Sequence, residues 1–139
     1  METADVRKKL QRTIEAAKRR AGERQARNDE ATRAFDVCLT RLAVPLFRQV
    51  ANILKSEGYA FTVFTPSGSV RLMSDRRPED FLDLSLDSDG DSPQVVLRVS
   101  RNRGGRVLES EGALGGPDAL TEEGLLESVT TALEPFVSK

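Results

Sequence analysis

The sequence predicts an α+β fold in which helices cover one face of an antiparallel sheet. Apolar residues recur at steps of three and four in the N-terminal part, alternate along the middle, and return to helical spacing near the C-terminal end. A helix, four to five strands and a second helix, in this order, are typical of a two-layer domain. At 139 residues the chain has the length of one domain.

The first helix is predicted over residues 3–57, and its apolar stripe has a thin part and a strong part. The strong part spans residues 31–54. The thin part consists of Val6, Leu10, Ile14, Ala17 and Ala21. Residues 22–30 add only Ala26, so the pattern leaves two structures open: one long helix with a polar middle, or two hinged helices of which Asn28 caps the second.

Two residues shape the strong part of this helix. Pro45 predicts a kink, because proline lacks the N–H that donates to the preceding turn. Gly58 follows the last apolar residues and predicts a C-cap. The chain therefore divides into a basic amphipathic helical extension, residues 1–30, and an α+β domain, residues 31–139.

Five segments in the middle of the chain have the period of two that is typical of strands. They are predicted at about residues 59–65, 69–74, 81–87, 94–100 and 106–110, as an antiparallel meander. Pairing Leu82 with Val99 gives the sheet one aliphatic face. The same register places a row of charged residues on the other face, namely Arg71, Asp83 and Arg98. Only one face of the sheet then needs a cover.

The stretch RVSRNRGGRVLES, residues 98–110, carries four arginines within a predicted hairpin. Pairing Val99 with Val107 predicts a three-residue loop over residues 102–104. Three arginines are then left without a partner, namely Arg101, Arg103 and Arg106. No aromatic residue accompanies them, so we interpret the stretch as a turn and not as a nucleic-acid contact.

The second helix is predicted at about residues 122–137. Thr121 is a suitable N-cap, and two glutamates follow it in the first turn. Pro135 bends or ends the helix. The stripe that would cover the sheet contains Leu125, Leu126, Val129, Leu133, Phe136 and Val137.

Composition excludes most catalytic chemistry. The chain has no histidine, the commonest general base and the usual activator of serine and cysteine nucleophiles. Cys38 lies on the apolar stripe and is interpreted as a core thiol. The loop DSDGD, residues 87–91, fits an acidic turn better than a calcium site, because a calcium loop starting at Ser85 needs glutamate where Val96 stands. We predict no enzyme activity, no metal and no cofactor.

The N-terminal sequence lacks the apolar core of a secretory signal, and no uninterrupted run of about 18 apolar residues occurs. A lone cysteine is consistent with a reducing compartment. These observations predict a cytoplasmic protein without a membrane span.

Charge is distributed unevenly, with a net +5 over residues 1–58 and −6 over residues 59–139. One face of the extension is basic, through Lys8, Lys9, Arg12, Arg19, Arg20 and Arg27. Contact with solvent or an acidic protein explains this face best. Nucleic acid is the second interpretation, weakened by interspersed acidic residues and the lack of aromatic ones, and a membrane surface is the third.

The length of the first helix leads to the functional hypothesis. At 1.5 Å per residue it spans about 80 Å, several times the length of a strand, so the sheet cannot cover the thin stripe. We expect a second copy to cover it as a coiled coil in a homodimer; the alternative is that residues 1–30 are disordered in isolation.

The element order is similar to that of secretion chaperones and dimeric adaptor domains, without a shared motif. The predicted function is a non-catalytic, adaptor or chaperone-like protein-interaction domain of bacterial origin. A nucleic-acid-associated protein is the alternative, and a small-ligand binder is a third class that no polar constellation supports.

Overall fold

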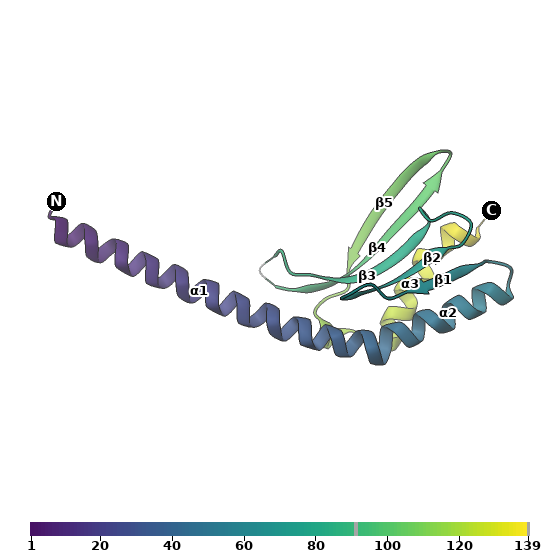
Figure 1. Ribbon diagram of the computed structural model, residues 1–139, viewed down its shortest axis with the longest axis horizontal. Coiled ribbons are helices and arrows are strands. Elements are labelled where there is room, and N and C mark those ends of the chain that lie inside the picture. The colour runs from purple at the N-terminus through teal and green to yellow at the C-terminus, as the bar shows by residue number, and fades with distance from the viewer. Residues whose placement is uncertain (91, 139) are drawn as a thin grey trace.

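In the computed structural model, which describes residues 1–90 and 92–138, one continuous helix runs from Thr3 to Ser56. It comprises α1 (Thr3–Cys38), a π-helical turn η1 (Leu39–Ala43) and α2 (Val44–Ser56). Figure 1 shows α1 extending away from the remainder of the chain, whereas α2 lies along the sheet.

The long-helix prediction is confirmed, and the alternative of two helices hinged over residues 22–30 is wrong. Asn28 lies inside α1 and caps nothing. The physical reason is that arginine, glutamate, glutamine and alanine dominate this segment and are strong helix formers, so they outweigh the cost of about 1 kcal/mol for Gly22.

The predicted disturbance at Pro45 takes the form of the π-helical turn. The N–H of Val44 donates to the carbonyl of Leu39, one residue further back than in an α-helix. This wider turn immediately precedes the proline, which then occupies the first turn of α2 where a missing N–H costs little. The helix changes direction at this point (Figure 1).

The end of α2 is a Schellman motif, as the position of Gly58 predicts. The N–H of Tyr59 donates to the carbonyl of Leu54 at 2.8 Å, and that of Gly58 donates to Lys55 at 3.1 Å. Gly58 has φ +92°, which a residue with a Cβ rarely adopts. Because Tyr59 takes part in this cap, the first strand begins later than the predicted residue 59.

The sheet is an antiparallel meander with strand order β1-β2-β3-β4-β5. Its strands are β1 (Phe61–Phe64), β2 (Ser69–Ser74), β3 (Phe81–Asp87), β4 (Gln94–Arg103) and β5 (Arg106–Ala113). The predicted bounds of β2 and β3 are confirmed. β1 is shorter than predicted, whereas β4 and β5 are longer.

Strand pairing confirms the predicted register of β2, β3 and β4. Leu82 pairs with Val99, and Asp83 lies between Arg71 and Arg98. β5 extends the charged row, since Glu111 pairs with Arg98. Charges of alternating sign thus cross four strands on the uncovered face.

The predicted register of the arginine-rich hairpin is wrong. Arg103 pairs with Arg106, so the loop has two residues and not three. Those residues, Gly104 and Gly105, have φ of +62° and +82°. A two-residue turn with two positive φ angles matches the twist of the flanking strands, and two adjacent glycines form it without steric cost.

The C-terminal helix, α3 (Glu122–Val137), has the predicted bounds and follows a 3₁₀ turn, η2 (Pro117–Ala119). The N–H of Gly124 donates to Thr121 Oγ1 at 3.1 Å, which confirms the predicted N-cap. The helix continues past Pro135 to Val137. Together α2 and α3 form the layer that covers one face of the sheet (Figure 1).

The core lies between this helical layer and the sheet, and its members are buried and aliphatic or aromatic. They include Phe35, Phe47, Val70, Leu72, Leu82, Leu84, Val95, Leu125 and Val129. Burial on this scale stabilises the domain by about 1.5–3 kcal/mol per large side chain. The same layer leaves β5 uncovered, since every residue of β5 is exposed.

Candidate interaction surface

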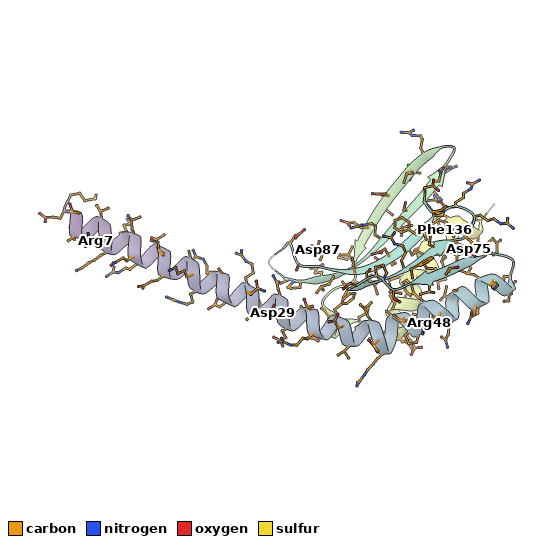
Figure 2. The ribbon with its side chains drawn as sticks, viewed as in Figure 1. Arg7, Asp29, Arg48, Asp75, Asp87 and Phe136 are labelled. Carbon is orange, nitrogen blue, oxygen red and sulfur yellow. The ribbon has the colours of Figure 1, made fainter. Side chains whose placement is uncertain are left out.

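The predicted apolar stripe lies on α1 and faces solvent. Its three large members are Val6, Leu10 and Ile14, with exposed fractions of 41, 57 and 51%. Ala17 and Ala21 continue it and are also exposed. Figure 2 shows Arg7 near the free end of α1 and Asp29 where the helix reaches the domain. No contact in the described residues brings a second element to this stripe.

The same side of the helix becomes buried where α1 reaches the domain. Asn28 and Ala31 are half-buried and Phe35 is buried, at helical steps from Ala21. α1 contacts η2 in this region. Asn28 Oδ1 is buried without a hydrogen-bond partner, so the first polar residue at the domain boundary is incompletely satisfied.

The predicted basic face also lies on the projecting part of α1, and its six members are all exposed: Lys8, Lys9, Arg12, Arg19, Arg20 and Arg27. Acidic residues interrupt it, among them Glu15 and Glu23. The first aromatic residue of the helix is Phe35, which is buried in the domain. The face therefore provides charge for a partner but no stacking surface.

An apolar cavity of about 460 Å³ between α2 and α3 was not predicted. Ile53 and Leu126 line it and are 62 and 44% exposed, on the side of the helices that faces away from the sheet. The amphipathic pattern predicts which side of each helix faces the core. It does not predict that apolar residues on the outer sides of two helices meet.

A second unpredicted cavity, of about 400 Å³, lies between the β4–β5 hairpin, the turn before β3 and the end of α3. Arg77, Arg101 and Arg103 are among its lining residues. The sequence did not predict that these arginines lie together, because the predicted three-residue loop placed Arg103 at the tip of the hairpin.

Among the described residues, the candidate catalytic and metal-binding groups form no organised site. Cys38 packs against the core, and burial raises the pKa of its thiol. A raised pKa leaves less of the nucleophilic thiolate at neutral pH. In residues 1–90 and 92–138 no three acidic or thiol side chains are grouped to hold a metal ion. Asp91 of the acidic loop lies outside these residues.

By length and composition alone, the helix Thr3–Ser56 contains an 18-residue window apolar enough to cross a membrane, although two-fifths of it is buried. Core residues such as Leu39, Leu46 and Phe47 belong to this helix and pack against the sheet. Their burial accounts for part of the apolar composition. The absence of a membrane span stays a prediction.

The charged row on the open face has a defined centre. Arg71 Nε donates to Asp83 Oδ2 at 3.1 Å, and Asp83 is buried. The Arg71 guanidinium also lies 4.1 Å from the centre of the Phe81 ring. One ion pair therefore lies at the centre of this face, and Arg98 and Glu111 are opposite each other in the neighbouring strands.

Comparison of the chain with protein-family models, with curated proteins and with solved structures finds no match.

Proposed function

We propose that this protein is a non-catalytic, adaptor-like interaction domain that forms a homodimer through the apolar stripe of α1. The observation that carries the proposal is the exposure of Val6, Leu10 and Ile14 on a helix that projects from the domain. An isolated helix of this kind is marginal in water unless its apolar side is covered.

The small apolar area of the stripe limits the strength of the dimer. Each large stripe residue is about half exposed, so burying the remainder stabilises by about 1 kcal/mol. Three such residues from each of two chains contribute about 6 kcal/mol, which exceeds the roughly 4–15 kcal/mol cost of association only at the lower end of that range. We therefore expect a weak dimer that forms at high protein concentration and dissociates on dilution.

The fold favours antiparallel pairing of the two α1 helices. In a parallel pair, the partner helix would continue along the side of α1 that carries Phe35, where α1 packs into its own domain. An antiparallel pair overlaps only along the projecting segments and places the two domains at opposite ends. With Val6 opposite Ala21, it also sets the large Leu10 against the small Ala17, which lets the helices pack evenly.

Two matched double variants test the homodimer. Leu10→Gln/Ile14→Gln removes the apolar stripe, and Arg12→Gln/Arg19→Gln removes charge from the opposite, basic face. Light scattering over a concentration series should give a mass that approaches twice 15.3 kDa for the natural chain and the arginine variant, and 15.3 kDa for the stripe variant. A natural chain that is monomeric at all concentrations, or a stripe variant that stays dimeric, contradicts the proposal.

The same variants decide the alternative, a nucleic-acid-associated protein. The observation in its favour is the exposure of all six basic residues on one projecting face. If it is right, duplex DNA or single-stranded RNA binds with an affinity that falls steeply with salt, and Arg12→Gln/Arg19→Gln weakens that binding. Absence of binding at low salt rules the alternative out.

Helix direction can be tested by disulfide cross-linking in a Cys38→Ser background. A mixture of Val6→Cys chains with Ala21→Cys chains should form mixed disulfides readily, because an antiparallel pair brings these positions together. Each variant alone should cross-link poorly. The reverse result, efficient cross-linking of each variant alone, indicates a parallel pair.

A further inference from the structure

The hairpin register brings arginines to the helix-covered side of β4. Residues that alternate along a strand share a face, so Arg101 and Arg103 lie on the same side as Leu97, which is buried in the core. The end of α3 meets this side of β4 at Pro135 and Phe136. On this side of β4, the residues under the helices are apolar, and those beyond the end of α3 are basic.

These residues line a cavity of about 400 Å³, which we call the arginine cavity. Arg77 enters from the turn between β2 and β3, and Asp80 follows it in the same turn. Phe136 provides an apolar wall and is half-buried. A volume of this size is within the range of sites for small organic ligands.

Hydrogen bonds hold the turn against β4 and so fix the position of Arg77 relative to the hairpin. Ser100 Oγ donates to the carbonyl of Glu79 at 2.7 Å, and Ser100 is 1% exposed. The backbone N–H of Asn102 donates to Asp80 Oδ1 at 2.7 Å. The Asp80 carboxylate is thus engaged by the backbone. Among the described residues Arg71 forms an ion pair with Asp83, and the three arginines of the cavity form none.

The net charge of the cavity indicates the charge of the ligand that it can bind. Three guanidinium groups and one carboxylate leave a net charge of +2. A phosphomonoester carries about −1.5 to −2 at neutral pH, whereas a carboxylate carries −1. Guanidinium groups bind phosphate oxygens through two parallel N–H donors. We propose that the arginine cavity binds a small organic phosphomonoester, with the phosphate on the arginines and the organic group against Phe136.

Titration calorimetry with phenyl phosphate, inorganic phosphate and benzoate tests this proposal. Phenyl phosphate should bind more tightly than inorganic phosphate, because its ring contacts Phe136, and roughly tenfold more tightly than benzoate, because of its second charge. No binding of phenyl phosphate, or equal binding of phenyl phosphate and benzoate, overturns the proposal. Binding of inorganic phosphate as tight as that of phenyl phosphate shows that the site does not read the organic group and also overturns it.

Variants locate the site. Arg101→Gln/Arg103→Gln should weaken phenyl phosphate binding by roughly tenfold or more. Arg98→Gln is the control, since it removes one arginine charge from the same strand on the opposite face, and it should bind phenyl phosphate as the natural chain does. Should the double variant fail to fold, Arg77→Gln in the exposed turn replaces it with the same expectation. Equal losses in the control and in the cavity variants place the binding elsewhere and overturn the proposal.

Discussion

Residues 3–27 and α2 belong to one continuous helix, yet they have opposite environments. In α2 the apolar side is closed by the sheet and α3, and Phe47 is fully buried. In residues 3–27 nearly every side chain is exposed, including the aliphatic ones. Two segments of one continuous helix therefore need not share a hydrophobic core. The stripe on the projecting segment is thinner, which agrees with the proposal that a single helix covers it rather than a sheet.

The largest expected effect on stability is in the domain. Phe47→Ala removes a fully buried ring and should lower the free energy of unfolding by about 3–5 kcal/mol. Ile14→Ala is the matched change on the projecting segment and should leave unfolding of the domain unchanged at low protein concentration. Urea denaturation measures both. A large loss from Ile14→Ala would show that the projecting segment is part of the domain's cooperative unit.

The charged row gives a smaller effect on the open face of the same domain. Asp83→Ala leaves Arg71 without its carboxylate partner and should cost about 1–3 kcal/mol, since Asp83 is buried. Asp87→Ala, at the exposed end of β3, should change the unfolding free energy by less than about 0.5 kcal/mol. Equal effects in the two variants would contradict the role given to the Arg71–Asp83 pair.

The hairpin turn can be tested through its glycines. Gly105→Val forces a branched residue to φ near +82° and should cost about 1–2 kcal/mol by urea denaturation. Gly104→Asn should cost much less, because Asn-Gly is favoured in this two-residue turn. If both substitutions are neutral, the register that builds the arginine cavity is wrong.

The smallest effect concerns Cys38, whose thiol we expect to react slowly with alkylating reagents. Because burial raises the pKa of its thiol, alkylation by iodoacetamide should be slower in the folded protein than in urea at every pH below the raised pKa. The ratio of the two rates measures the protection. Faster reaction in the folded state would contradict the interpretation of Cys38 as a core thiol and would indicate an activated nucleophile.

The sequence predicts most of the fold because each element carries its own local signal. The change from helical to alternating spacing near Gly58 defines the helix–sheet boundary, and Thr121 starts α3. The register of β3 and β4 follows from matching Leu82 with Val99. These signals depend only on neighbours in the sequence or on a single strand pair.

The remaining features depend on geometry that local patterns do not contain. In the hairpin over residues 98–110, apolar matching favours the wrong register: the predicted three-residue loop pairs Val99 with Val107, whereas the observed pairing sets Val99 against Ser110. The two-residue loop depends instead on the positive φ angles of Gly104 and Gly105. The arginine cavity follows from that choice and from where α3 ends. The stripe on α1 is visible in the sequence, but its partner is not, since the partner is proposed to be another chain.

The central claim is that residues 3–27 become protected only by a second copy, whereas the domain is stable alone. Hydrogen exchange measured over a concentration series tests this claim directly, because it reports on both regions in one experiment. We predict that amide protection over residues 3–27 rises with protein concentration while that of α2 and β3 stays constant. Protection over residues 3–27 that does not change with concentration would contradict the claim.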